Sequence, residues 1–101
     1  MRIGDVEIAD ERLREFCQRW RIAEFAIFGS ALREDFRPDS DIDVLVTFQE
    51  DARWSLFDIV TMGDEIRSLV GREVDVVDKK GLRNPFRRHE ILRTRKVLYV
   101  A

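Results

Sequence analysis

Apolar and polar positions follow two periods along the chain, and together they predict four helices and four strands. Apolar residues at helical spacing predict helices over residues 10–19, 31–33, 56–70 and 86–94. Short apolar runs rich in β-branched residues predict strands over residues 25–28, 41–48, 73–78 and 97–100. Helices and strands therefore alternate, which favours an α/β or α+β domain with helices packed on a small sheet.

Single residues mark where several of these elements begin and end. Asp10 and Ser30 are expected to cap the first two helices, because their side-chain oxygens can accept hydrogen bonds from free amides. Gly71 follows the third helix at a position that suits a left-handed C-cap. Cys17 lies on the apolar stripe of the first helix, so we expect it to be buried.

Composition indicates one globular domain covering residues 1–101. Hydrophobic residues make up 45% of the chain, and no apolar run approaches the ~20 residues of a membrane span. The N-terminal segment has no apolar stretch of signal-peptide length, so we expect a cytoplasmic protein without a membrane partner. Cys17 and His89 are the only cysteine and histidine, which leaves oxygen ligands for any metal and indicates magnesium, manganese or calcium.

Charge is distributed unevenly, although the net charge is only −2. Residues 34–51 hold seven acidic residues and one arginine, whereas residues 79–96 hold eight basic residues and one glutamate. One interpretation is that these are two solvated faces of the same domain. The other is that the acidic segment contributes to a site for metal and phosphate, while the basic segment docks an acidic partner.

Two aspartates open the second long strand. Asp41 and Asp43 are two residues apart, so their side chains point the same way, with Cα atoms roughly 6.5–7 Å apart. Carboxylates placed in this way can share a divalent ion; the alternative is that both simply flank a strand end in solvent. Asp75 stands in the middle of another apolar strand, where a buried carboxylate needs a metal, an arginine or water.

A Gly-Ser turn precedes these acids, between a predicted strand and a predicted helix. Gly29 allows a close approach of the backbone, amides at the start of a helix attract phosphate, and the Ser30 hydroxyl adds a donor. Together with three carboxylates on two strands, this turn describes a two-metal site for phosphoryl transfer. In such a site the carboxylates hold the ions and the ions hold the triphosphate.

The spacing of these residues resembles that of a known family. Gly29-Ser30, ten further residues and then Asp41-Ile42-Asp43 form the pattern G-S-x10-D-x-D within the stretch FGSALREDFRPDSDIDVLVTF. This region is similar to the signature of the minimal nucleotidyltransferases of the DNA polymerase β superfamily. The later EVDVVD resembles the strand that carries their third acid. The resemblance implies a palm-like nucleotidyltransferase fold, with a small mixed sheet and flanking helices.

The resemblance also implies which residues bind the nucleotide. Gly29 and Ser30 would contact its phosphates, together with Arg33 and Ser40 of the same signature. Many relatives carry Ala-Arg-Gly after the Gly-Ser turn, whereas this chain reads Ala-Leu-Arg-Glu over residues 31–34, so its arginine is shifted by one position.

The three acids would form the catalytic metal centre, again by resemblance. Asp41 and Asp43 would ligate two magnesium ions, for which manganese could substitute. Asp75 would complete the ion nearer the attacking hydroxyl and assist the deprotonation of that hydroxyl.

By the same resemblance, the protein would transfer AMP from ATP to a tyrosine of a HEPN-domain ribonuclease toxin and so act as the antitoxin. We expect no direct binding of nucleic acid. Two alternatives stay open: a nucleotidyltransferase-like module that neutralises its partner by contact, and a subunit that modifies a small molecule. The intact set of acids favours transfer over contact. A chain of 101 residues has no second domain to enclose a small acceptor, which disfavours the last alternative.

Overall fold

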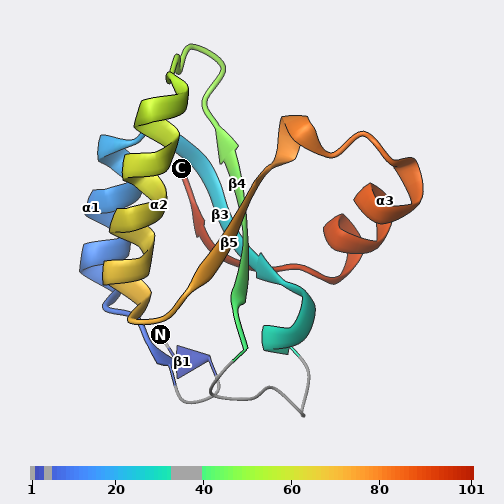
Figure 1. Cartoon of the computed structure of the whole chain (residues 1–101), viewed down its shortest axis with the longest axis horizontal. Helices are drawn as coiled ribbons and strands as arrows, with labels where there is room; N and C mark the ends of the chain where they lie inside the picture. The colour runs from blue at the N-terminus through green and yellow to red at the C-terminus, as the bar shows by residue number, and fades with distance from the viewer. Residues whose placement is uncertain (1, 4–5, 33–39) are drawn as a thin grey trace.

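Two helices pack on one face of a four-stranded sheet and a third helix lies on the other face (Figure 1). The structure is a computed structural model that describes residues 2–3, 6–32 and 40–101. The helices are α1 (Asp10–Arg19), α2 (Leu56–Val70) and α3 (Pro85–Thr94). The strands of the sheet are β3 (Ile22–Phe28), β4 (Ile42–Phe48), β5 (Val74–Asp78) and β6 (Lys96–Val100). Shorter elements are the 3-10 turns η1 (Gly29–Leu32) and η2 (Lys79–Gly81) and a hairpin of β1 (Arg2–Ile3) and β2 (Val6–Glu7). Among the described residues, no helix combines the length and the apolar character needed to cross a bilayer.

The sheet is mixed, with the strand order β5-β4-β3-β6. β3 pairs antiparallel with β4 and β6, whereas β4 and β5 run parallel because α2 carries the chain back between them. The registers set Asp43 of β4 between Phe28 of β3 and Asp75 of β5. The predicted fold class is confirmed, and the end of β3 meets the starts of β4 and β5 at one end of the sheet.

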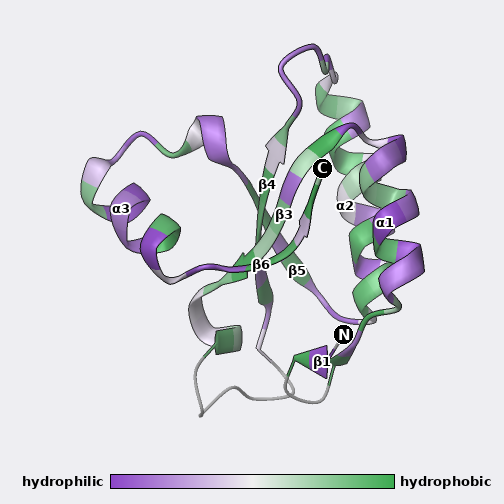
Figure 2. Ribbon diagram, turned by 180° about the vertical axis from the view of Figure 1, so that it is seen from behind, coloured by the Kyte–Doolittle hydropathy of each residue, from purple (hydrophilic) through white to green (hydrophobic). Residues whose placement is uncertain are grey.

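The two faces of the sheet are buried to different extents. On β4, Val44 and Val46 point into the main core beneath α1 and α2, whereas Leu45 between them points to the opposite face. That opposite face carries a second, smaller core beneath α3, built from Ala26, Phe28, Leu45, Leu82 and Ile91. Figure 2 shows α3 standing apart from α1 and α2, with the sheet between them. Only part of the second face is therefore covered.

The predicted helix ends are confirmed only in part. Gly71 ends α2 in the left-handed conformation, with φ of 78°. The prediction that Asp10 caps α1 is wrong, because Ala9 holds the N-cap position without a side-chain bond and Asp10 is the first helical residue. An acid in the first turn still interacts favourably with the helix dipole. Ser30 likewise lies inside η1 rather than before it.

Cys17 is fully buried in the main core, as predicted. Burial removes solvent from the thiol and raises its pKa to about 12. Since the thiolate is the reactive form, this cysteine is inert at neutral pH and serves packing.

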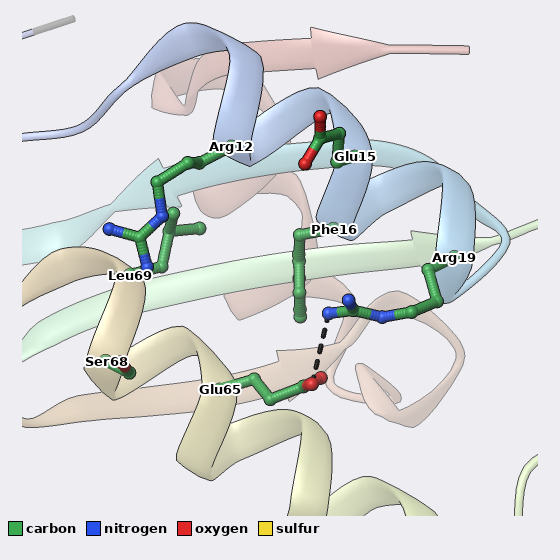
Figure 3. A pocket seen from close by; sticks show the side chains of 7 residues that line it. All are labelled: Arg12, Glu15, Phe16, Arg19, Glu65, Ser68 and Leu69. Atoms are coloured by element: carbon green, nitrogen blue, oxygen red, sulfur yellow. Dashed lines mark hydrogen bonds and ion pairs between the residues drawn. The ribbon is translucent and has the colours of Figure 1, made fainter.

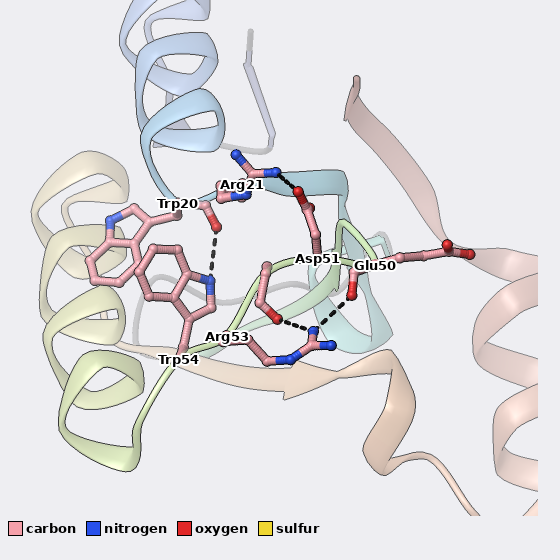
Figure 4. Close-up of polar contacts among 7 residues, drawn as sticks. Trp20, Arg21, Glu50, Asp51, Arg53 and Trp54 are labelled. Atoms are coloured by element: carbon pink, nitrogen blue, oxygen red, sulfur yellow. Dashed lines mark hydrogen bonds and ion pairs between the residues drawn. The ribbon is translucent and has the colours of Figure 1, made fainter.

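Two tryptophans close the end of the sheet that lies opposite Asp43 (Figure 4). The rings of Trp20 and Trp54 meet edge to face, with centroids 4.9 Å apart. The Trp54 indole N–H also donates to the Trp20 carbonyl at 3.0 Å. Beside them, the exposed Arg21 and Asp51 side chains form an ion pair. These contacts join the loop before α2 to the end of α1.

Polar contacts cap α3 at its start and tie it to the sheet at its end. At its start, the Asn84 side chain accepts hydrogen bonds from the amides of Phe86 at 3.0 Å and Arg87 at 3.2 Å. Just after its end, Arg95 donates to both carboxylate oxygens of Glu24 on β3, at 2.7 and 3.1 Å. The side chains of this ion pair are only 23% and 20% exposed. The pair therefore ties α3 to the sheet in a partly dry environment.

We expect Glu24→Gln to destabilise the fold by about 1–2 kcal/mol near neutral pH, because Arg95 would lose its charged partner. The hydrogen bonds from Arg95 hold the pKa of Glu24 below its ordinary value of 4.5. A carboxylate with a lowered pKa stabilises the folded state fully above that ordinary value, and this stability is lost as pH falls through the folded-state pKa. Urea denaturation over a pH series should therefore show wild type and Glu24→Gln converging in acid.

Glu90→Gln is the matched control, since Glu90 also pairs with an arginine, Arg93, at 2.7 Å, but both side chains are largely exposed. Water screens such a pair, so its loss should change stability far less. Equal destabilisation by the two substitutions would contradict a special role for the Glu24–Arg95 pair.

Candidate functional site

The predicted carboxylates gather at one end of the sheet, on the face that α3 covers only in part. Asp43 precedes Leu45 by two residues on β4, and Asp75 precedes Val77 by two on β5, so both lie on the side of the second core. The parallel register sets Asp43 and Asp75 side by side. Asp41 lies immediately before β4, and its charge acts on Asp43. The fold thus brings together acids that are far apart in sequence.

Asp43 is the half-buried member of this group. Partial burial raises the pKa of Asp43 above its ordinary value of 3.8, and the neighbouring charges of Asp75 and Asp41 raise it further. The guanidinium of Arg87 and a hydrogen bond from the Ser30 amide act in the opposite direction. The carboxylates of Asp41, Asp43 and Asp75 repel one another, and a cation bound among them would relieve that repulsion.

Of the three partners expected for Asp75, a metal, an arginine or water, the structure gives it water, because its side chain is exposed. β5 is an edge strand of the sheet, so water reaches this carboxylate and the expected cost of burial does not arise. The structural alternative, an ion pair with an arginine, is not formed within the part of the chain that the structure describes. Asp75 is therefore available to a ligand.

Gly29 allows the backbone to pass directly against the Asp43 carboxylate. Its φ of 72° is left-handed, and a Cβ at this position would lie within 3.0 Å of Asp43 Oδ2. The turn also directs the amide of Ser30 to the same carboxylate. Contacts of Gly29 and Ser30 with the nucleotide phosphates stay a prediction.

The start of β4 is held by the segment that follows α2. Arg72 donates a hydrogen bond to the Ser40 carbonyl, and the Ile42 amide donates to the Glu73 carbonyl at 3.0 Å. These bonds fix the backbone on both sides of Asp41. A contact of Ser40 with the nucleotide stays a prediction, and Arg33 lies outside the described residues.

The three acids suit magnesium by their chemistry rather than by a preformed geometry. Asp41, Asp43 and Asp75 offer only oxygen ligands, which magnesium prefers. Among the described residues, however, no three Asp, Glu, His or Cys side chains stand close enough together to hold a metal ion. Like charges repel, so the carboxylates are neighbours without converging. Metal binding by these acids stays a prediction.

Part of the basic segment 79–96 serves the fold itself. Arg88 donates to the Lys79 carbonyl at 3.2 Å and so holds η2 against α3. Arg93 and Arg95 are both in ion pairs with glutamates. Docking of an acidic partner on the remaining basic residues stays a prediction.

A pocket of about 240 Å³ lies between α1 and α2, on the other face of the sheet (Figure 3). An ion pair of 3.1 Å between Arg19 and Glu65 spans it from one helix to the other. Its walls come from these two helices alone. The sheet separates this pocket from the carboxylates, so it is not part of their site.

Comparison with known proteins identifies the family and the fold. A model of the nucleotidyltransferase domain family matches residues 10–98. Protein adenylyltransferase MntA of Thermococcus cleftensis is 32% identical over 86% of this chain and 83% of that protein. A solved structure described as that of a candidate minimal nucleotidyltransferase is 33% identical, with a TM-score of 0.70 over 86% of both chains. A crystal structure of a toxin–antitoxin with AMP-PNP has a TM-score of 0.71 over 93% of this chain and 75% of that chain, and its 16% identity shows a shared fold only.

Gly29→Ala should disable the site, whereas Gly71→Ala should not. Both glycines have left-handed φ angles, 72° and 78°, so alanine should cost about 1–2 kcal/mol of stability at either position. At Gly29 the added Cβ would collide with the Asp43 carboxylate. At Gly71 no atom of the described residues lies within 4 Å of the added Cβ. Urea denaturation should show a loss for both variants, at least as large for Gly29→Ala, and calorimetry with magnesium and ATP should show a binding defect for Gly29→Ala alone. Equal nucleotide binding by the two variants would contradict the importance of this close approach.

Proposed function

Because the chain belongs to the nucleotidyltransferase domain family, we propose that it transfers AMP from ATP, with magnesium, to a tyrosine of a HEPN-domain ribonuclease toxin and acts as the antitoxin. The observation that carries the chemistry is the placement of Asp43 beside Asp75, with Asp41 and the Gly29 turn at the same end of the sheet. The name of the 32% identical relative, protein adenylyltransferase, supports a protein as the acceptor.

The proposed role of each residue follows from its position in the site. Asp41 and Asp43 would hold two magnesium ions, and Asp75 would complete the coordination of one of them. Magnesium bound there would offset the charge of the triphosphate and favour displacement at its α-phosphorus. Gly29 keeps the chain close enough to Asp43 for phosphates and carboxylates to meet at one point.

The transfer step forms one bond and breaks another. The tyrosine hydroxyl oxygen attacks the α-phosphorus of ATP, and the bond from that phosphorus to the bridging oxygen breaks, so that pyrophosphate leaves. The exposed Asp75 would receive the phenolic proton, since water and an incoming side chain can both reach it. AMP then remains on the tyrosine through a phosphodiester bond.

The acids, rather than the fold, distinguish AMP transfer from neutralisation by contact alone. A protein that neutralises its partner by contact alone has no use for a half-buried carboxylate whose pKa is raised by burial and, further, by two neighbouring acids. That electrostatic strain favours a ligand-binding site and therefore favours the enzyme.

The variant Asp41→Asn with Asp43→Asn should lose transfer by about a thousandfold or more, because metal contacts contribute several kcal/mol and each ~1.4 kcal/mol is tenfold in rate. Its stability should be unchanged or higher, since the substitutions relieve like-charge repulsion. Mass spectrometry of the HEPN partner after incubation with ATP and magnesium measures the transfer. Asp64→Asn, which removes an exposed acid of α2, is the control and should transfer normally.

The same double variant also tests neutralisation in cells. If it protects cells from the toxin as well as wild type does, contact rather than AMP transfer is the mechanism. Loss of protection, with the variant still folded and still bound to the toxin, supports the enzyme.

Magnesium or manganese together with ATP should raise the melting temperature of the wild-type protein, because a ligand of the native state stabilises it. The gain should be about 2.7 kcal/mol in unfolding free energy when ligand exceeds its dissociation constant a hundredfold. Differential scanning fluorimetry should show this shift for wild type and Asp64→Asn, and its loss in the Asp41/Asp43 double variant. An unchanged melting temperature for wild type at millimolar metal and ATP would contradict the site.

A further inference from the structure

A groove of about 420 Å³ runs between η1 and α3, on the same side of the sheet as the carboxylates. It is lined by Phe28, Gly29, Leu32, Glu90, Ile91 and Thr94. Its volume lies within the roughly 300–1,000 Å³ of small-molecule sites. Gly29 lines this groove and also lies directly against the Asp43 carboxylate, so the groove opens beside the catalytic acids.

Arg87 lies on the side of α3 that forms this groove. It precedes Glu90, Ile91 and Thr94 by three, four and seven residues, a spacing that stacks side chains on one face of a helix. The Asn84 cap fixes the first turn, including the Arg87 amide. Arg87 is not itself a lining residue; it lies one turn closer to the start of α3 than Glu90 and Ile91, on the same face of the helix.

Arg87 is also the arginine of α3 whose charge is left for a ligand. Its neighbours Arg88 and Arg93 are engaged with the Lys79 carbonyl and with Glu90, respectively. Within the described part of the chain, the Arg87 side chain makes no hydrogen bond or ion pair. Its charge nevertheless acts on Asp43, which places the guanidinium near the carboxylate site.

Resting on the proposed function, we propose that Arg87 binds the phosphates of the nucleoside triphosphate while its nucleoside occupies the groove between η1 and α3. A guanidinium offers several fixed donors and pairs strongly with phosphate oxygens. The apolar walls from Leu32 and Ile91 suit the faces of a nucleobase. The phosphates would then lie between Arg87 and the acids, where cations held by the acids and the arginine neutralise them from two sides.

Arg87→Gln should weaken binding of magnesium-ATP by about ten- to a hundredfold, the usual loss when charged hydrogen bonds are removed. Binding of adenosine, which lacks phosphates, should stay within about twofold of wild type. Arg87→Lys should recover part of the ATP affinity, because it keeps the charge but loses the planar fork. Isothermal titration calorimetry with ATP and with adenosine, both in magnesium, measures these affinities.

Two further variants complete the test. Arg19→Gln is the matched control, since Arg19 lines the pocket between α1 and α2 on the other face of the sheet, and it should bind both ligands normally. Leu32→Ala shortens a wall of the groove, so it should weaken ATP and adenosine by similar factors.

The outcomes separate this inference from the proposed function. If wild type binds ATP and Arg87→Gln binds it equally well, Arg87 only balances the charge of Asp43, and the inference is overturned while the proposed function stands. If Arg87→Gln weakens ATP and adenosine equally, the assignment to the phosphates is overturned. If wild type transfers no AMP and binds no ATP, the proposed function fails and the inference fails with it.

Discussion

The two-residue alternation of β4 is the constraint on which the rest of the molecule depends. One set of its side chains must be covered completely, and α1 and α2 supply that cover for Val44 and Val46. The other set changes character along the strand, from Asp43 to Leu45, so the opposite face can be covered only from Leu45 onward. α3 packs there and leaves the acidic end open. The position of the site thus follows from where apolar side chains on one face of one strand give way to carboxylates.

Much of the fold could be predicted because its longer elements carry strong local signals. The apolar spacing of α2 and the glycine at its end define a helix whose observed bounds agree with the prediction. The hairpin of β1 and β2 has two residues in each strand, too few for any period to appear, and was not predicted. The cap at Asp10 was misplaced by one residue, because acids are favourable both at the cap and in the first turn. Such ambiguities arise where alternative local conformations differ little in energy.

The candidate site could be predicted as a set of residues but not as an arrangement. Spacing along the chain identified Asp41 and Asp43, and an acid within an apolar run identified Asp75. Their placement depends on the parallel register of β4 and β5, which involves residues more than thirty positions apart and follows from the packing of α2. The effect of the Arg87 charge on Asp43 could not be predicted for the same reason, because a run of basic residues does not reveal which of them lies near the acids. Tertiary packing had to separate it from Arg88, which holds the backbone of η2.

The small size of the second core has a consequence for binding itself. Within the described part of the chain, the second core has five buried side chains, one of which is Ile91 of α3 itself, whereas the main core unites eighteen buried residues. The Glu24–Arg95 pair anchors α3 at one end. Local opening of a protein requires less free energy where fewer apolar contacts must separate, so α3 can detach while the main core stays intact. A groove formed in part by such a helix exists only in the closed fraction of molecules. The apparent affinity for a ligand in that groove is then the intrinsic affinity multiplied by the closed fraction. An acceptor protein that holds α3 against the sheet would raise this apparent affinity without touching the ligand.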